Sequence, residues 1–353
     1  MVTVANAMLV PLTVQLRNAG VAFVEFLRQA VTLAGVALLV ALGASLTPFF
    51  AVQIAVGLIV LAIVPVLVGR SGLVRPRFDR AEQRQLMATA LPVAIAFGLG
   101  QAYFRLVIVL MSLISSPEQT GYFGGSLRAM DALITFPMLA AGVALPLLAA
   151  VRADRERLRY ALAGLSEGAA IAGVLVILVM TRAAEPVMAA IGGEAFGPSG
   201  AVLRIQVCAL LFIALYQIWG VALVALGRQR ELILTNGLAI LGMACFAGFL
   251  VPSLGARGGA IATVLGDALL ASLIYWRLHL ATGKVTVRRG FPLRVVTAAA
   301  VAGAVLLLPA LPDLVASALA GALFLGVGWA IGMIPQEVRE MAAPLRRATR
   351  FGR

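Results

Sequence analysis

The sequence predicts an all-α protein, a polytopic bundle of transmembrane helices, and three observations support this class. The 353 residues are 62% hydrophobic and only 12% charged, whereas soluble domains are about half apolar and a quarter charged. The apolar residues form about ten long blocks, each close to the roughly 20 residues that a helix needs to cross a bilayer. Basic residues gather in every second connection between these blocks.

We expect the apolar blocks to be helices, because backbone groups in lipid must find hydrogen-bond partners within their own segment. A membrane barrel would instead show short segments of alternating polarity. The expected spans cover residues 29–47, 49–69, 88–114, 122–150, 160–181, 199–227, 232–252, 259–281, 293–311 and 314–334.

The first apolar stretch, residues 1–16, is too short to be a further full span. It lacks a basic lead-in and a cleavage site of small residues, so we do not expect a signal peptide. We expect a short remnant of a helix whose beginning is missing. Residues 17–28 then resemble an amphipathic connection on the cytoplasmic side.

The net charge is +13, and the basic residues that cause it are distributed unequally between the two sides of the predicted membrane protein. Alternate connections are rich in arginine and lysine, while the remaining ones hold only Arg182 and Arg257. Because basic loops stay in the cytoplasm, this pattern places the C-terminus there. It also accounts for the charge without a nucleic-acid partner, so we expect none. The basic segments are residues 17–28, 70–84, 152–159, 228–230, 277–294 and 339–353.

The sequence contains no motif for covalent chemistry. It has no phosphate-binding loop and no nucleophile elbow, and no soluble domain separates the apolar blocks. Cys208 and Cys245 lie within apolar blocks, and the single histidine is His279. These residues are too few and too scattered for a zinc site or a disulfide framework. We therefore expect no enzyme activity, no cofactor and no metal.

Charged residues inside the apolar blocks are the most informative feature, because such groups are costly in lipid and usually pair or face a cavity. Arg105 and Asp131 lie at equal separations before and after Glu118. Two antiparallel helices would therefore place them at similar depth. Arg128 is one turn from Asp131 on the same helix face. We expect these three charged residues to form a cluster with one net positive charge.

This cluster has two interpretations. In the first, Arg105 and Asp131 form an ion pair whose sole role is to hold two helices together. A surplus of arginine in a cavity would instead suit a phosphate-bearing substrate, because the guanidinium fork matches phosphate oxygens. We assign Arg128 the stronger functional role and include Gln101 and Arg204 as candidate substrate-binding residues. Arg204 could alternatively extend to the outer membrane surface.

Two acidic residues and several polar ones complete the candidates. Asp267 could bind a coupling cation or cap a neighbouring helix. Glu167 lies near the predicted cytoplasmic end of its helix, where we expect it to be solvated. The polar residues that could line the same cavity, or form ordinary interhelical hydrogen bonds, are Tyr103, Gln206, Gln217 and Asn236.

A family resemblance follows from several motifs taken together. The segment RFDRAEQRQLMATALPVAIAFGLGQAYFRLVIVLMS combines a basic amphipathic lead-in with a Leu-Pro that opens a helix. The segment SSPEQTGYFGGSLRAMDALITFPMLAAGVALPLLA then forms a TGYF…LR hairpin and a helix with internal prolines. Further along come GGEAFGPSGAVLRI and ALGRQRELILTNGLAILGMACFAGFLVPSLGARGGAIATVLGD. In order and spacing, over about residues 60–285, these motifs resemble the polysaccharide and lipopolysaccharide flippases of the multidrug/oligosaccharidyl-lipid/polysaccharide exporter superfamily.

The resemblance implies two helical bundles around a central cavity that opens to each side of a bacterial inner membrane in turn. The implied substrate is a lipid-linked oligosaccharide on a polyprenyl diphosphate, moved without making or breaking a bond. Basic family cavities imply a diphosphate-binding role for Arg105 and Arg128. The implied division is a remnant of the first bundle (1–76), a second bundle (77–285), two additional helices (286–334) and a basic cytoplasmic tail (335–353).

Two alternatives stay open. A drug/cation antiporter of the same superfamily would favour an acidic or apolar cavity over a basic one. A non-transporting membrane component, working with other glycan-assembly membrane proteins, is favoured by the short first bundle.

Overall fold

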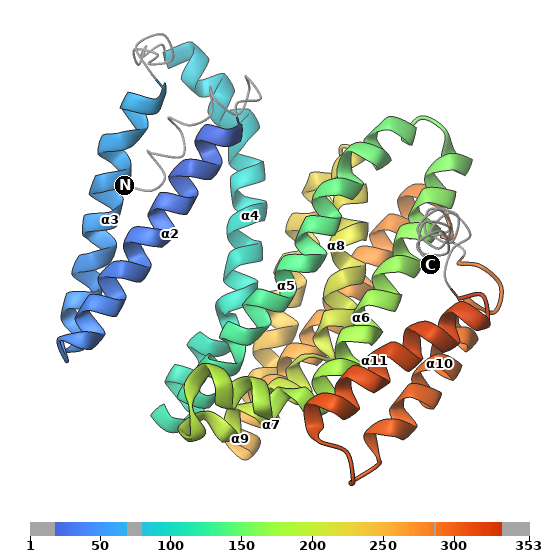
Figure 1. Ribbon diagram of the computed structural model, residues 1–353. Coiled ribbons are helices and arrows are strands. Elements are labelled where there is room, and N and C mark those ends of the chain that lie inside the picture. The colour runs from blue at the N-terminus through green and yellow to red at the C-terminus, as the bar shows by residue number, and fades with distance from the viewer. Residues whose placement is uncertain (1–17, 69–79, 286, 334–353) are drawn as a thin grey trace, which may run out of the picture. The chain divides into compact units, whose positions relative to one another are not determined.

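A computed structural model describes residues 18–68, 80–285 and 287–333 (Figure 1). Regular secondary structure in these ranges is helical, without strands. Packing divides the chain into two compact units, Met1–Gln85 and Leu86–Arg353. The division falls inside helix α4 (Arg80–Ile114), nine residues after the predicted division at 76–77. The predicted helix remnant 1–16 and the predicted cytoplasmic tail 335–353 lie outside the described residues.

The first unit contains a helical hairpin of α2 (Asn18–Ala41) and α3 (Leu46–Val68). Gly43 closes α2 with a φ of 61°, a left-handed conformation that glycine adopts without steric cost. The hairpin has a small core of its own, formed by Val24, Val56, Val60 and Val64. Large apolar side chains such as Phe26 and Leu33 remain exposed, as expected for helices that face lipid.

The second unit begins with the hairpin of α4 and α5 (Pro117–Val151), followed by α6 (Arg155–Gly192). Ser116 caps α5 because its hydroxyl accepts the amide hydrogen of Gln119 (3.3 Å). Asp154 caps α6 by accepting the amide hydrogen of Glu156 (3.0 Å). Both side chains satisfy donors that a helix start leaves without partners.

The predicted span 199–227 is broken in two. The short helices η1 (Glu194–Phe196) and α7 (Gly197–Gln206) lead into α8 (Ala209–Ala225) through a bend of 49°. Neither of the residues at the bend, Val207 and Cys208, is a glycine or proline, so the sequence carries no breaker there. The bend places the end of α7 inside the unit, where Gln206 is buried.

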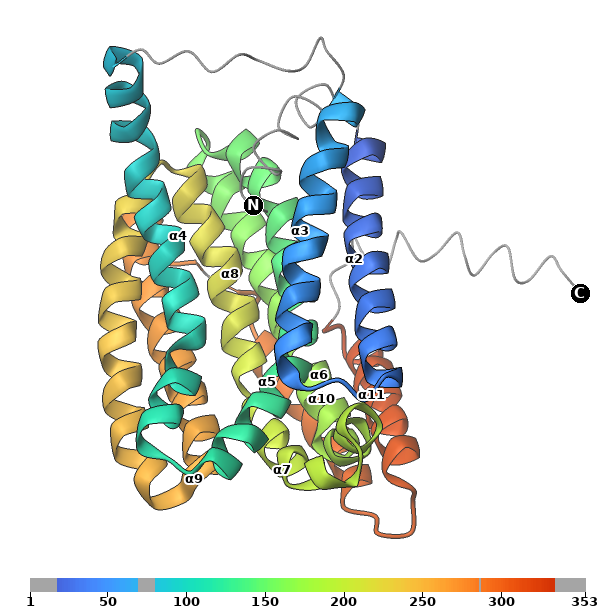
Figure 2. The same ribbon diagram turned by 90° about the vertical axis from the view of Figure 1, so that its left-hand side faces the viewer.

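Helix α9 (Gln229–Thr282) is two antiparallel limbs rather than one rod. Its 54 residues would extend about 80 Å if straight, far beyond a hydrocarbon core of about 30 Å. The chain turns at Gly255 (φ 54°, ψ −131°). A β-carbon on Gly266 would lie 2.4 Å from the Met243 methyl group, and these residues are almost equally distant from Gly255. The limbs, visible in Figure 2, correspond to the predicted spans 232–252 and 259–281.

The last two described helices, α10 (Phe291–Leu306) and α11 (Asp313–Ala330), form a hairpin that packs on α6. Leu178 of α6, Ala298 of α10 and Phe324 of α11 meet in a separate small core.

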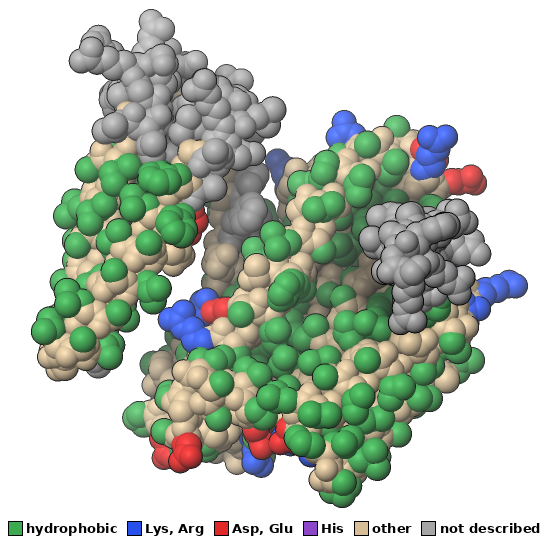
Figure 3. All heavy atoms as spheres, in the orientation of Figure 1, with side chains coloured by type: hydrophobic (Ala, Val, Ile, Leu, Met, Phe, Trp, Pro, Cys, Tyr) green, Lys and Arg blue, Asp and Glu red, His purple; other side chains and the backbone are tan. Residues whose placement is uncertain are grey.

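The helix inventory agrees with the predicted fold class. By length and composition, six helices of the described part could cross a membrane, or seven if α7 and α8 form one span. The second limb of α9 and the shorter apolar helices Gly98–Ile114 and Phe291–Leu306 bring the number to the predicted ten. Figure 3 shows hydrophobic side chains over most of the visible surface, with charged ones gathered mainly near helix ends.

Candidate substrate and ion sites

The first candidate site is the arginine group, which we define as Arg105 of α4 with Arg128 and Asp131 of α5. A guanidinium nitrogen of Arg105 lies 3.1 Å from a carboxylate oxygen of Asp131, so the predicted ion pair is present. The side chains of the pair are 49% and 35% exposed. At about 1.5 Å per residue, Arg128 lies about 16 Å along α5 from its first residue. The group is therefore well inside an apolar helix pair rather than at its end.

Arg128 has no hydrogen-bond or ion-pair partner among the described residues, and its side chain is exposed. Gln101, one turn before Arg105 on α4, is also exposed. The Arg105–Asp131 pair is internally neutral, so the guanidinium of Arg128 supplies the net positive charge of the group. An exposed guanidinium with five donors and no partner can bind an anion.

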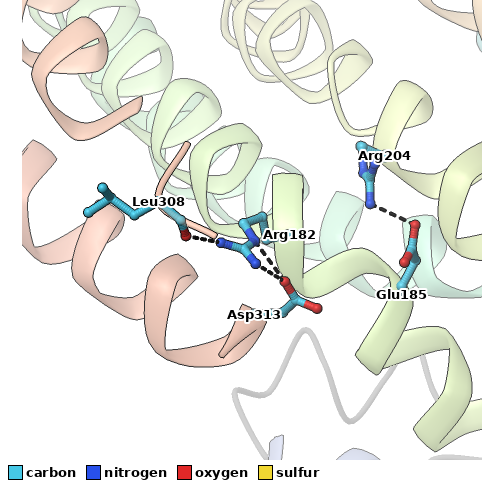
Figure 4. A network of polar contacts seen from close by, with 5 residues as sticks. All are labelled: Arg182, Glu185, Arg204, Leu308 and Asp313. Carbon is cyan, nitrogen blue, oxygen red and sulfur yellow. Dashed lines mark hydrogen bonds and ion pairs between the residues drawn. The ribbon is translucent and has the colours of Figure 1, made fainter. Parts of the chain in front are cut away.

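Arg204 does not join the arginine group. Its guanidinium pairs with the carboxylate of Glu185 on α6 at 2.7 Å, and both side chains are about half exposed. One turn earlier on α6, Arg182 donates to Asp313 (2.7 Å) and to the carbonyl of Leu308 (2.9 Å). Figure 4 shows these contacts, in which α6 holds α7 through one side chain and the α10–α11 hairpin through the other.

The second candidate site is a buried polar cavity around Asp267, on the second limb of α9. Asp267 is 1% exposed and accepts a hydrogen bond from the Tyr103 hydroxyl of α4 (2.9 Å). The cavity has a volume of about 30 Å³, enough for roughly two waters. Gln206 and Thr263 also line it.

This cavity contains polar groups without partners in the described part of the chain. Neither the oxygen nor the nitrogen of the buried Gln206 amide, which lines the cavity, has a hydrogen bond. Asp267 has no cationic partner there either. Buried polar groups are normally satisfied, and a buried carboxylate is costly without a counter-charge. The arrangement can therefore accept a small cation, a proton or water.

The Asp267 cavity gathers residues that the sequence named separately. Tyr103 and Gln206 were predicted as cavity-lining residues, and both lie here, whereas Gln217 and Asn236 do not. The hydrogen bond from a tyrosine hydroxyl does not support the alternative in which Asp267 caps a helix. Sequence reasoning missed Thr263, which also lines this cavity. A helix broken inside an apolar block often marks an ion site, but the α7–α8 bend has no sequence signal.

The expectation that Glu167 is solvated is wrong. This residue is 1% exposed, and its carboxylate oxygens accept the backbone amide and a guanidinium nitrogen of Arg288, both at 2.7 Å. Arg288 also donates to the carbonyl of Met333 (2.7 Å). The connection before α10 folds back over this end of α6, which removes the carboxylate from solvent.

Comparisons with known proteins identify the fold. No protein-family model matches the chain, and no curated protein sequence matches it. Among solved structures, the lipid II flippase MurJ in its inward closed conformation is similar, with a TM-score of 0.71 and 12% sequence identity. The match covers 88% of this chain and 67% of that one. At this low identity the similarity concerns the fold alone. The chain is an all-α, multi-pass membrane protein whose fold resembles that of MurJ.

Proposed function

We propose that this protein moves a lipid-linked oligosaccharide, carried on a polyprenyl diphosphate, from one membrane leaflet to the other. The observation that supports this proposal best is the guanidinium of Arg128, which has no partner within the described ranges and lies one turn from the Arg105–Asp131 pair. A charge inside an apolar helix pair is costly in lipid, so it is retained where it faces a polar group or water. A diphosphate is an anion that guanidinium groups bind well.

The arginine group also fits the requirements of transport. Its members are partly exposed, so a substrate can reach them, and the neutral Arg105–Asp131 pair can orient the helices that carry them. Gln101 could donate hydrogen bonds to the sugar or phosphate, whereas Arg204 has a weaker claim because Glu185 already neutralises it. Flipping requires no bond to be made or broken, and the similar solved structure is likewise a flippase rather than an enzyme.

The cavity at Asp267 is our candidate for coupling transport to a cation or proton gradient. It offers a carboxylate, the hydroxyls of Tyr103 and Thr263, and an amide without a partner among the described residues, in a space of about 30 Å³. This acidic cavity is also the observation that favours the second candidate function, a drug/cation antiporter. The antiporter would use Asp267 directly and would not require Arg128, so the two functions differ in their dependence on Arg128.

We further propose that the protein lies in a bacterial inner membrane with its C-terminus in the cytoplasm, as the distribution of basic residues indicates. Other glycan-assembly membrane proteins are the partners that this function suggests. The division into first-bundle, second-bundle and C-terminal segments belongs to the same proposal.

The proposed function can be tested in proteoliposomes that contain a fluorescent polyprenyl-diphosphate sugar. Leaflet transfer is measured as the fraction of label that an external quencher reaches. We expect Arg128→Ala to reduce transfer by about tenfold or more, the loss expected for one charge-assisted hydrogen bond. Arg155→Ala is a matched control, because Arg155 is also exposed and unpartnered among the described residues but lies at a helix start.

Normal transfer by Arg128→Ala, at equal reconstitution, would remove the functional role of this residue. The ion pair is tested separately by Arg105→Asp, Asp131→Arg and the double variant with both changes. If the pair orients the helices, each single change lowers transfer and the double change restores part of it. Full activity in both single variants would show that the pair is unnecessary.

A further inference from the structure

A second, larger pocket lies at the opposite ends of the helices from most of the basic connections. Its volume is about 730 Å³, within the range of about 300–1,000 Å³ that is usual for ligand sites. It is bounded by the α4–α5 connection, the turn of α9 and the start of α7. All three belong to the connections that the charge pattern assigns to the outer side of the membrane.

The lining of this outer pocket combines polar and apolar side chains, with one cation and no acidic side chain. Arg257 is exposed and has no hydrogen-bond or ion-pair partner among the described residues. The other arginine of the predicted outer connections, Arg182, is fully engaged by Asp313 and Leu308. Glu118, the nearest acid in sequence to the α5 side of the pocket, is not part of the lining and accepts a hydrogen bond from Tyr122 (2.8 Å).

Uncharged donors line the same pocket as this arginine. The carbonyl oxygen of the Gln119 side chain accepts the backbone amide hydrogen of Ala256 (2.9 Å), which leaves the side-chain NH₂ group free to donate. The Ser116 hydroxyl accepts the backbone amide hydrogen of Gln119, so its own hydrogen remains available to donate. The hydroxyl of Ser115 has no partner in the described residues. The Gln119–Ala256 bond also holds the turn of α9 against α5, so the donors lie on a fixed frame.

We propose that this outer pocket binds the phosphate group of a lipid. A single unpaired guanidinium with neutral amide and hydroxyl donors suits a phosphate oxygen cluster, and a pocket without a carboxylate does not repel it. The phosphate can come from a bulk phospholipid headgroup or from the diphosphate of a translocated substrate. Only the second source rests on the proposed function, because a bulk phospholipid headgroup can bind whether or not the protein flips a lipid-linked substrate. The pocket lining does not include the arginine group.

The test uses the full chain in an uncharged detergent and two soluble probes, geranyl diphosphate and dihexanoylphosphatidylglycerol, titrated by calorimetry. We expect at least one probe to bind, and Arg257→Gln to weaken that binding by about tenfold or more. Arg230→Gln is the control, since Arg230 is exposed and unpartnered among the described residues but lies on the opposite side. Ser115→Leu, which removes a donor without touching the charge, should weaken binding less.

The outcomes separate the sources. If geranyl diphosphate alone binds in an Arg257-dependent way, the pocket is assigned to the substrate. If the phosphatidylglycerol alone does so, the pocket is assigned to bulk lipid. Arg257-dependent binding of both assigns the pocket to lipid phosphate in general. Binding of neither probe, or equal binding by Arg257→Gln and the wild type, overturns the proposal. If Arg257-dependent binding persists while the liposome assay detects no flipping, the outer pocket stands and the proposed function fails.

Discussion

The ion pair between the buried Glu167 and the partly exposed Arg288 allows a quantitative prediction about the C-terminal hairpin. Replacing Arg288 with alanine leaves a carboxylate that is 1% exposed with one backbone amide as its remaining donor. A buried charge that loses its partner costs about 3–5 kcal/mol. Arg288 itself is 39% exposed, so water can reach part of the site and we expect the lower end, about 3 kcal/mol.

Glu167→Gln should cost less, because the amide oxygen still accepts the Arg288 amide hydrogen and the freed guanidinium can turn toward water. One charge-assisted hydrogen bond is lost, which corresponds to about 1.5 kcal/mol. The double variant Glu167→Gln/Arg288→Ala should cost less than the sum of the two, because it no longer leaves a buried charge unpaired.

Hydrogen–deuterium exchange of the full chain in detergent measures these effects locally. A loss of about 3 kcal/mol should accelerate exchange in α10 and α11 by about a hundredfold where local opening limits exchange. Exchange in the first limb of α9 serves as the internal control, because α9 packs mainly on α8, α7 and α5 rather than on α6 or α10. Unchanged exchange in α10 and α11 of Arg288→Ala, or a larger effect of Glu167→Gln, would refute the reasoning.

Two further predictions concern the interior of the second unit. Asp267→Asn keeps an acceptor for the Tyr103 hydroxyl but removes the charge, so transport should lose its dependence on an imposed cation or proton gradient. Thermal unfolding of this variant should not occur at a lower temperature, because an uncompensated buried charge is removed; unchanged gradient dependence would contradict the coupling role. Gly173→Ala should destabilise the unit by about 1–3 kcal/mol, because its β-carbon would lie 2.7 Å from the Leu211 α-carbon of α8. Gly168→Ala, on the same helix with open space around the added carbon, should instead be neutral or stabilising by up to about 1 kcal/mol, and equal unfolding midpoints for the two variants would contradict the close packing.

Several features of the fold could be read from the sequence. The ten apolar blocks correspond to helices. Gly255 lies between two of these blocks in the sequence, and the chain turns there in the structure. The pairing of Arg105 with Asp131 was predictable because both residues belong to one short hairpin, whose antiparallel geometry relates sequence separation to depth. The role of the arginine group in substrate binding stays a prediction.

Other features depend on side chains that come from distant parts of the chain. The hydroxyl that contacts Asp267 belongs to Tyr103, 164 residues earlier, and the burial of Glu167 depends on Arg288, 121 residues later. Nothing near either residue in sequence reveals these partners. The break between α7 and α8 is similar, because residues 207 and 208 would be acceptable in a continuous helix.

The amino-acid sequence by itself determined that this is a helical membrane protein, since the free energy of placing a segment in lipid depends on the composition of that segment alone. It also indicated which connections share a side, because each basic loop contributes independently. Only the tertiary structure decided which charges are satisfied and which are free. In lipid the apolar faces of helices are nearly equivalent, so hydropathy does not specify how each helix is rotated. That rotation is set by the packing of small and large side chains between helices, and it leaves Arg128 and Arg257 unpartnered within the described residues while Glu167 is buried and paired.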